Sequence, residues 1–277
     1  MTRLFSYAVT APIFAVLLST NVMADPVATE ASRSSDDWQF AAFIYGYYAT
    51  IGTQATLPNG STSSVTIDAK DLFNNLKFGA LGSFEARKGS WGVYTDLMYM
   101  NVGAFKSQYH NLIIGGMSLP ADASSSTNFG LESVVWTLTG TYRVAATDSS
   151  TLDVIAGARL FAEKIKVDWT LNGNIGSIPL PGRAGTVSAN EDYYDGVVGI
   201  KGRAAFGGDR KWFFPYYGDI GTGNSKLTWQ LMAGLGYAFN WGELIGGWRH
   251  VGYEFKSGSP VSSTNFDGPM LGAAFLW

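Results

Sequence analysis

The two histidines are the first residues to consider for chemistry, because imidazole can act as a general base or bind a metal near neutral pH. His110 lies between Tyr109 and Asn111, and His250 follows Arg249. Neither belongs to an Asp-x-His cluster, and no serine occupies a Gly-x-Ser-x-Gly turn that would expose a nucleophile. Hydrolysis of a lipid ester by His250 with a loop serine stays an alternative. The pattern favours two non-catalytic histidines, and we expect no enzymatic activity.

Metal ligands and cofactor-binding motifs are equally sparse. The chain has no cysteine, and no glycine-rich loop leads into a helix as it does in nucleotide-binding proteins. The acidic pairs Asp36-Asp37 and Glu191-Asp192 could hold Ca²⁺ weakly, but further spaced oxygen ligands are missing. We therefore expect no metal and no cofactor. The formal net charge of −3, without a basic run, argues against nucleic acid as a partner.

Charged side chains recur at alternate positions within apolar segments, which is the period of a β-strand. In 76–87, Leu76, Phe78 and Phe84 share one face, whereas Glu85 and Arg87 share the other. The same parity places matched acids and bases on the polar faces of candidate strands. The acids are Glu85, Asp96, Asp153, Glu163, Asp195 and Asp219, and the bases are Arg87, Arg143, Arg159, Lys201, Arg203 and Arg249.

The elements that carry these charges are strands joined by links of two kinds. Alternation predicts ten strands, at 38–50, 76–88, 91–104, 131–147, 151–169, 191–206, 212–222, 226–239, 243–256 and 266–277. Tight turns at 88–90, 147–150, 207–211 and 240–242 alternate with longer links at 51–75, 105–130, 170–190 and 257–265, and 223–225 is a short exception. Residues 68–76 could form a short helix. This order predicts an all-β, antiparallel up-and-down transmembrane barrel of about ten strands, with eight or twelve as alternatives.

Both ends of the chain fit a barrel in a bacterial outer membrane. Residues 1–24 combine an early positive charge, a short apolar stretch and a small-residue cleavage site, which is typical of a secretory signal peptide removed on export. Residues 25–37 would be a periplasmic segment and 38–277 the barrel. The last strand is apolar and ends on Trp277, so it needs a closed sheet to hide its edge, and we expect the barrel assembly machinery to engage it.

The tryptophans provide a second indication of this topology. Indole rings prefer the boundary between hydrocarbon and headgroups, so a barrel in lipid carries an aromatic ring at each interface. The predicted strands place Trp38, Trp91, Trp212, Trp241 and Trp277 at periplasmic ends, and Trp136, Trp169 and Trp229 towards outer ends. Outer-membrane lipid and lipopolysaccharide are therefore the expected surroundings. A soluble β-sandwich with core tryptophans is the structural alternative.

The charges then belong inside the barrel, because an Arg or Lys facing lipid at the midplane costs about 2–4 kcal/mol. Matched signs can neutralise each other as hydrogen-bonded pairs, whereas a selective pore has an excess of one sign at its constriction. Ten strands are close to the number whose interior side chains just fill. We expect a largely plugged lumen and a structural or surface-interaction role for a non-enzymatic protein whose loop partner is unknown. A small-solute pore is the alternative, followed by a lipid-modifying or proteolytic barrel.

Four segments carry a resemblance to a known group of proteins. The runs 89–97 (GSWGVYTDL), 195–203 (DGVVGIKGR), 217–221 (YGDIG) and 247–251 (GWRHV) follow one another in the predicted strands. Together they resemble small outer-membrane barrel proteins of Gram-negative bacteria, of OmpA-like or opacity-like architecture. The resemblance covers nearly the whole chain after residue 24. It implies a barrel fold and an outer-membrane location, and no assigned activity.

Overall fold

The computed structural model describes residues 37–56, 62–107, 113–114, 117–118, 124–172, 174–175, 178–179, 183–259 and 261–277. The predicted signal peptide, most of the segment 25–37 and His110 lie outside these residues. No helix within the described ranges is long and apolar enough to span a bilayer.

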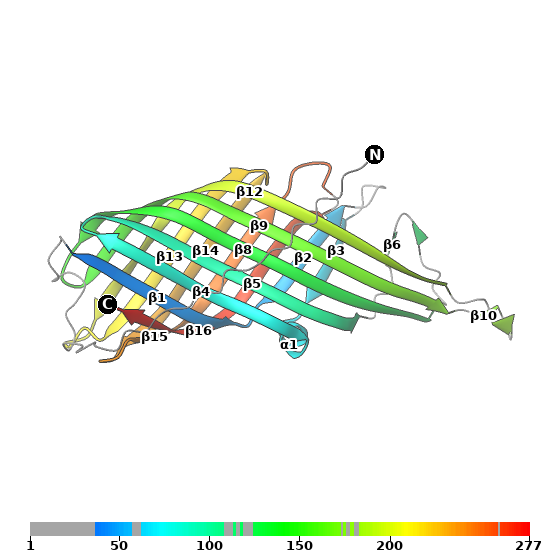
Figure 1. The fold of residues 1–277 in the computed structure, drawn as a ribbon, viewed down its shortest axis with the longest axis horizontal. Coiled ribbons are helices and arrows are strands. Elements are labelled where there is room, and N and C mark those ends of the chain that lie inside the picture. The colour runs from blue at the N-terminus through cyan, green and yellow to red at the C-terminus, as the bar shows by residue number, and fades with distance from the viewer. Residues whose placement is uncertain are drawn as a thin grey trace.

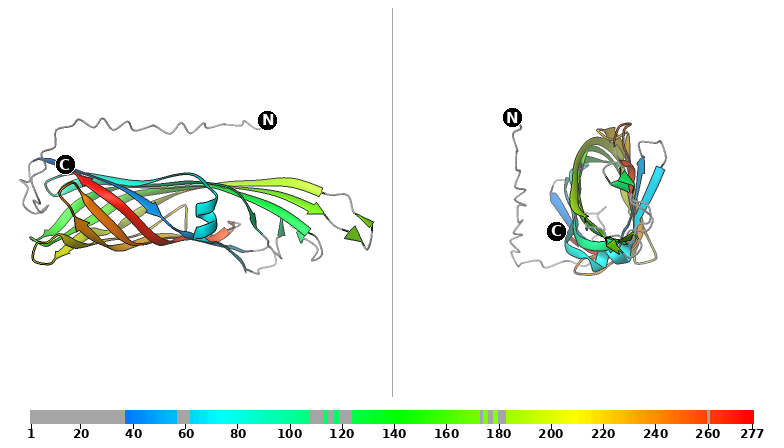
Figure 2. Two further views of the ribbon diagram at one scale, coloured as in Figure 1. Left: turned by 90° about the horizontal axis from the view of Figure 1, so that it is seen from below. Right: turned by 90° about the vertical axis from the view of Figure 1, so that its right-hand side faces the viewer.

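Ten long strands form a closed antiparallel barrel (Figures 1 and 2). In chain order they are β1 (Trp38–Tyr47), β4 (Leu76–Lys88), β5 (Trp91–Ser107), β8 (Ser124–Ala146), β9 (Ser150–Asn172), β12 (Arg183–Phe206), β13 (Trp212–Gly223), β14 (Leu227–Ala238), β15 (Glu243–Glu254) and β16 (Val261–Leu276). Each pairs with the next, and β16 returns to β1 from Ala41↔Leu276 to Tyr47↔Met270. The predicted up-and-down barrel of about ten strands is confirmed.

At their outer ends β8, β9 and β12 extend past the predicted bounds, by seven, three and eight residues respectively. β8, β9 and β12 pair continuously, including Ser124↔Asn172 and Arg183↔Leu171, and they project as a wall beyond the rest of the barrel (Figure 2). The predicted links 105–130 and 170–190 are therefore partly strand. Their Ser, Thr and Gly content is typical of loops, but each extension gains a backbone ladder with its neighbours that local composition does not reveal.

The predicted link 51–75 also contains regular structure. β2 (Thr50–Thr56) continues β1 along β16, turns back as β3 (Thr62–Ile67), and leads into α1 (Ala69–Asn74), the short helix expected within 68–76. Pro269 explains the interruption between β1 and β2, because its carbonyl accepts from the Tyr48 N–H but its own nitrogen has no hydrogen to donate. Two further short pairs complete the strand set: β6 (Ile113–Ile114) with β7 (Met117–Ser118), and β10 (Asn174–Ile175) with β11 (Ile178–Pro179).

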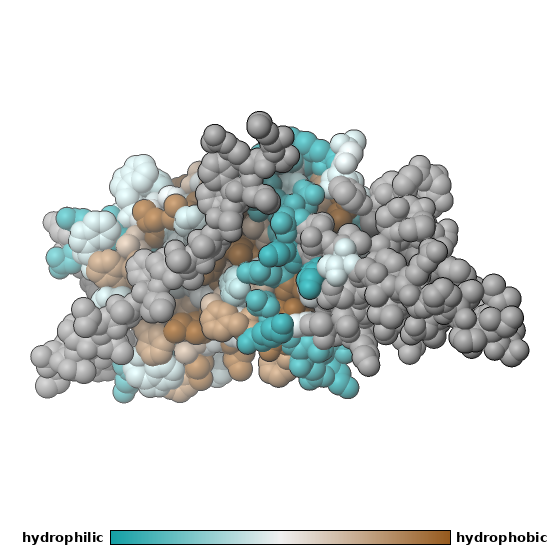
Figure 3. All heavy atoms as spheres, turned by 45° about the vertical axis from the view of Figure 1, so that its right-hand side comes forward, coloured by the Kyte–Doolittle hydropathy of each residue, from teal (hydrophilic) through white to brown (hydrophobic). Residues whose placement is uncertain are grey.

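The inner and outer faces of the barrel sheet differ as the alternation requires. Along β5, Asp96, Met98 and Met100 are buried inside the barrel, whereas Val93 and Leu97 are exposed on its exterior. Figure 3 shows apolar side chains gathered over one half of the surface, with a band of hydrophilic residues beside them. The exterior of this half therefore has the character of a lipid-facing belt, and the interior is packed.

Candidate functional site

The lumen contains a lower layer of ion pairs near the tight turns. Arg87 donates from Nη2 to Glu85 Oε1 at 2.7 Å and also pairs with Asp153 from across the barrel. Arg143 donates from Nε to the other oxygen of Asp153 at 2.8 Å, and Lys201 pairs with Glu85. These five residues come from β4, β8, β9 and β12. The charges alternate in sign through the layer, so each carboxylate contacts two cations.

A second lower contact adds a residue that the alternation did not single out. Arg203 Nη1 donates to Glu243 Oε1 at 2.7 Å, and the Arg203 guanidinium carbon lies 3.8 Å from the centroid of the Phe213 ring. Glu243 begins β15 directly after a tight turn, and an acidic residue in that position is typical of a solvated strand end. Glu243 lies six residues before Arg249 on the same strand and therefore on the same inward face, and this spacing could have identified it.

The middle of the lumen holds two pairs that are almost fully buried. Arg249 Nη2 lies 2.5 Å from Asp96 Oδ2, and Tyr45 donates to Asp96 Oδ1 at 2.9 Å. Arg159 pairs with Asp219, and both side chains are 0% exposed. These contacts join strands that are not neighbours in the sheet, so they cross the interior.

Neutral side chains complete the hydrogen bonding of the middle layer. Gln230 Oε1 accepts from Arg159 at 3.2 Å and from Arg249 at 3.1 Å, so it links the two pairs. Tyr217 donates to Asp219 at 2.5 Å, and Thr137 accepts from Arg159 Nε at 3.0 Å. Tyr45 and Gln230 were not singled out from the sequence, because only charged residues were used to trace the inward face.

A chamber of about 150 Å³ lies between the two charged layers. Glu85 and Lys201 line it from the lower layer, and Asp96, Arg249 and Gln230 from the middle layer. At about 30 Å³ per water molecule, it has room for roughly five waters. The lower half of the lumen therefore holds charged groups and room for water, beside the apolar side chains of Phe43, Met232, Ile245 and Met270.

The outer half of the lumen is apolar. A buried cluster fills it, to which β5, β8, β9, β12, β15 and β16 contribute Met98, Met100, Val135, Phe161, Tyr193, Val251, Tyr253 and Phe266. Phe161 and Tyr253 stack with ring centroids 4.4 Å apart. β2, β3 and α1 add Ile51, Ile67 and Leu72 from the side. The side chains thus pack as they do in a protein core.

Two predicted members of the charge network do not join an ion pair between described residues. Asp195 accepts from the Ser225 backbone N–H at 2.9 Å and from its hydroxyl at 2.7 Å, so it holds the β13–β14 turn. Glu163 lies three residues beyond Leu160, which pairs with Trp136, and is therefore outside the membrane-spanning part of β9. Burial, and then the nearby Glu191 carboxylate, raise the pKa of Glu163 to about 7.

The tryptophans lie on the exterior at two levels. Trp38, Trp91, Trp212, Trp241 and Trp277 are 43–70% exposed at the end of the barrel where the chain terminus meets β1, since Phe40 and Trp277 exchange backbone hydrogen bonds there. Trp136 and Trp229 are exposed towards the other end. The side chain of Trp169 lies outside the described set. Trp248, within β15, is also exposed on the exterior.

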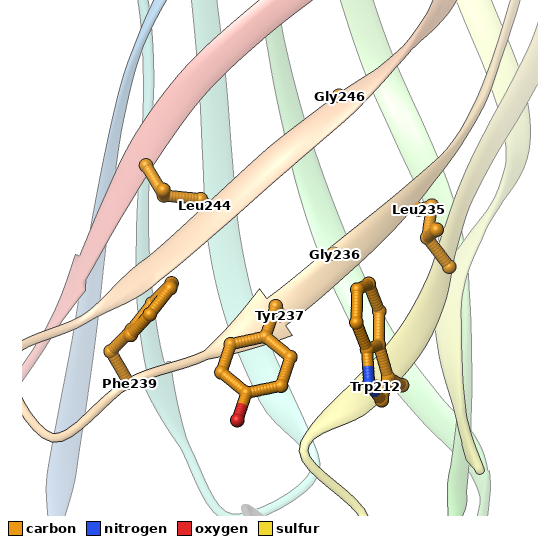
Figure 4. A pocket seen from close by; sticks show the side chains of 7 residues that line it. All are labelled: Trp212, Leu235, Gly236, Tyr237, Phe239, Leu244 and Gly246. Atoms are coloured by element: carbon orange, nitrogen blue, oxygen red, sulfur yellow. The ribbon is translucent and has the colours of Figure 1, made fainter. Parts of the chain in front are cut away.

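A groove of about 500 Å³ opens on the exterior next to the first of these levels. Figure 4 shows Trp212, Tyr237 and Phe239 along one edge, with Leu235 and Leu244 beyond them, all on the outside of the wall. Gly246 leaves the floor flat between these side chains. The shape and apolar lining suit a hydrocarbon chain of the surrounding lipid.

His250 also faces outwards and has two partners. Its Nδ1 lies 2.8 Å from Asp267 Oδ1, and its ring stacks on Trp229 with centroids 4.2 Å apart. Position 252, two residues further along the same face, is glycine, and a Cβ there would lie 3.3 Å from His250 Nε2. No serine or threonine hydroxyl of the described residues makes a hydrogen bond to the ring. No group of three or more potential metal ligands occurs in the described part of the chain.

A closed antiparallel barrel with an apolar exterior, aromatic rings at two levels and inward charges defines the class of outer-membrane β-barrels. Comparison with solved structures agrees. The outer-membrane protease OmpT from Escherichia coli matches with a TM-score of 0.51 at 10% sequence identity, over 90% of this chain and 100% of that chain. At this identity the likeness shows the fold alone.

Two further barrels match less closely. Ail, the attachment invasion locus protein of Yersinia pestis, gives a TM-score of 0.36 at 11% identity, over 87% of this chain and 99% of that chain. The translocator domain of the autotransporter NalP from Neisseria meningitidis gives 0.29 at 11% identity, over 88% and 90%. No family model and no curated protein matches the sequence. The chain is similar in fold to outer-membrane barrels of Gram-negative bacteria.

Proposed function

We propose that this protein is a non-enzymatic component of the bacterial outer membrane that supports the envelope or binds partners at the cell surface. Its lumen would be closed to solutes. The supporting observation is the apolar layer above the ion pairs, in which Met98, Val135, Phe161, Val251 and Phe266 are at most 1% exposed. A constriction lined by such side chains excludes water and therefore ions.

The surface role is supported by the tall wall of β8, β9 and β12. These strands continue past the pair of Trp136 and Leu160, and Figure 2 shows them projecting beyond the rest of the barrel. Binding residues are concentrated on loops held by a rigid scaffold. Outer-membrane lipid, lipopolysaccharide and the barrel assembly machinery, through the end of β16, are the partners that this role implies.

Conductance in planar lipid bilayers tests the closed lumen. We expect the native protein to give no stable single-channel steps. The double variant Phe161→Ser and Tyr253→Ser removes the stacked rings at the centre of the plug and should produce steps, which shows that the assay detects an opened barrel. Stable steps from the native protein would contradict the proposal.

A small-solute pore is the second candidate, favoured by the chamber that Glu85, Lys201, Asp96 and Arg249 line. In that case the native protein would conduct, and replacing Asp96 or Arg159 would abolish the steps.

A lipid-modifying or proteolytic barrel is the third candidate, favoured by the contact between His250 and Asp267. Incubation of the native protein with a lipid ester or a peptide measures this activity directly, and we expect no hydrolysis. Hydrolysis that disappears in His250→Ala would establish an enzyme.

A further inference from the structure

Three adjacent strands change from apolar to polar at one level of the exterior. On β16 the outward side chains run from Phe275 and Leu271 to Asp267, and β2 changes at Thr50, which pairs with Asp267. On β15 the change falls at His250, the other cross-strand partner of Asp267. The ten residue steps from Trp277 to Asp267 rise about 25 Å, at about 3.3 Å per step in a strand tilted by about 40°. This is the height of a lipid-facing belt, so Asp267 lies at its outer edge.

A groove of about 690 Å³ opens at this level on the exterior. Its residues belong to β2, β3, β15 and β16, with Tyr48 from the link between β1 and β2 and Ala69 from α1. The floor is open because Gly52 has no side chain, and a Cβ there would lie 2.8 Å from Asn265 Oδ1. The depth of the groove therefore depends on the missing side chain at Gly52.

The lining combines aromatic walls with uncharged hydrogen-bonding groups and one carboxylate. Its side chains include Tyr48, Trp248, Thr50, Gln54, Asn265 and Asp267. Among the described residues no lysine or arginine lines it, so this lining is unsuited to phosphate. Asp267 Oδ1 accepts from Trp248 Nε1 at 3.1 Å and contacts His250, whereas Asp267 Oδ2 accepts no hydrogen bond from a described residue.

This chemistry matches a sugar ring. The carbon–hydrogen face of a pyranose can pack on the indole of Trp248, while its hydroxyl groups donate to Asp267 Oδ2 and exchange hydrogen bonds with the amides of Gln54 and Asn265. An amino substituent on the sugar would face the Asp267 carboxylate favourably. We propose that this groove binds the saccharide headgroup of an outer-leaflet glycolipid, whose acyl chains lie along the apolar surface below it.

Retention of glycolipid by the purified full-length protein tests this proposal. The protein is extracted in mild detergent from nanodiscs that contain lipid A together with phosphatidylglycerol, and bound lipids are counted by native mass spectrometry. We expect the native protein to retain lipid A at least tenfold more than phosphatidylglycerol. Gly52→Leu, which fills the floor, should reduce lipid A retention at least tenfold.

Two further variants keep the experiment decisive. Gly196→Leu adds the same side chain to an outward glycine whose nearest atom, Thr222 O, is 3.8 Å from a Cβ, and it should retain lipid A like the native protein. Trp248→Leu removes the stacking surface without filling the floor, and it should also lower retention if Gly52→Leu fails to fold. Folding of each variant is checked by its heat-dependent migration in gels.

Dephosphorylated lipid A separates sugar from phosphate recognition and should be retained like lipid A. Equal retention by the native protein and a folded Gly52→Leu or Trp248→Leu variant would overturn the site. Retention that requires the phosphates, or comparable retention of phosphatidylglycerol, would overturn the saccharide assignment.

Discussion

Replacing Arg159 by methionine would leave Asp219 as a buried carboxylate without a cation. Both side chains are 0% exposed, and Arg159 also donates to Thr137 at 3.0 Å and to Thr228 at 3.2 Å. Removal of one partner of a buried ion pair costs about 3–5 kcal/mol, because the remaining charge is neither solvated nor paired. We therefore expect Arg159→Met to lower the free energy of unfolding by about 3–5 kcal/mol, and Asp219→Leu to do the same.

The double variant should be more stable than either single one. Replacing both partners by apolar side chains of similar volume is often nearly neutral. The hydroxyl of Tyr217, which donates to Asp219 at 2.5 Å, would lose its acceptor at a cost of about 1–3 kcal/mol. The two single losses together amount to about 6–10 kcal/mol, against about 1–3 kcal/mol for the double variant, so the coupling energy should be at least about 3 kcal/mol.

Reversible unfolding by urea in lipid vesicles, followed by tryptophan fluorescence, measures all four proteins at one pH. The exposed pair Lys226 and Glu254, with side chains 68% and 47% exposed and 3.0 Å apart, provides a control cycle whose coupling should not exceed about 1 kcal/mol. Additive losses at Arg159 and Asp219, within about 0.5 kcal/mol, would refute the reasoning that these charges stabilise the barrel as a pair.

Two further predictions concern the outer part of β9 and the curvature of the wall. Raising the pH from 4.5 to 7 should lower the free energy of unfolding, because the folded state keeps the Glu163 proton that the unfolded chain releases near pH 4.5. Urea titrations at the two pH values should show a smaller decrease in the Glu163→Gln variant. The same decrease in native protein and variant would contradict this origin. Gly199→Ala places a Cβ 2.1 Å from the backbone oxygen of Gly218 and should cost about 1–3 kcal/mol. Gly140→Ala has its nearest atom at 3.8 Å and should change stability by no more than about 0.5 kcal/mol, so equal urea midpoints for the two variants would contradict the steric argument.

The alternation of apolar and polar residues along single strands was enough to predict the barrel and to predict which charged side chains face its interior. Asp96, Asp153, Arg159 and Arg249 are each at most 2% exposed, on the inward parity. This works because a strand in a barrel has only two faces, and lipid and a packed lumen make opposite demands on them.

The identity of the pairs could not be predicted in the same way. Asp96 and Arg249 are 153 residues apart, and Arg87 and Asp153 are 66 apart. Which charges meet depends on the stagger of all strands around the barrel and on side-chain length, neither of which has a local signature. Asp195 is an example: its side chain faces inwards as predicted, but it accepts a hydrogen bond from the turn residue Ser225 and does not pair with a cation.

The extent of the strands was also beyond local composition. Residues 124–130 and 183–190 contain the small and polar residues of loops, yet they extend the ladders of β8, β9 and β12. Above the membrane both faces of a strand can be polar, so the two-residue period that identifies a transmembrane strand fades although the backbone pairing continues.

The lumen has a charged half and an apolar half, and the pairing of the barrel strands explains this division. β1 pairs with β4 only from Trp38↔Lys88 to Ile44↔Gly82. Beyond Gly82 no described strand pairs with β4 on that side, which leaves a seam in the ladder. There α1 connects the β2–β3 hairpin to the start of β4, and Asn75, directly after α1, accepts a hydrogen bond from the Gly103 N–H of β5 at 2.7 Å.

In the closed half, a continuous ladder fixes the strands and the interior can hold charged pairs at fixed separations. In the half with the seam, a ladder is absent on one side, so packing must hold β2, β3 and α1 against the rest of the wall. Ile51, Ile67 and Leu72 do this by joining Phe161 and Phe266 in one apolar cluster. The plug that closes the lumen and the core that seals the seam are therefore the same set of side chains, and a change that opens one should loosen the other.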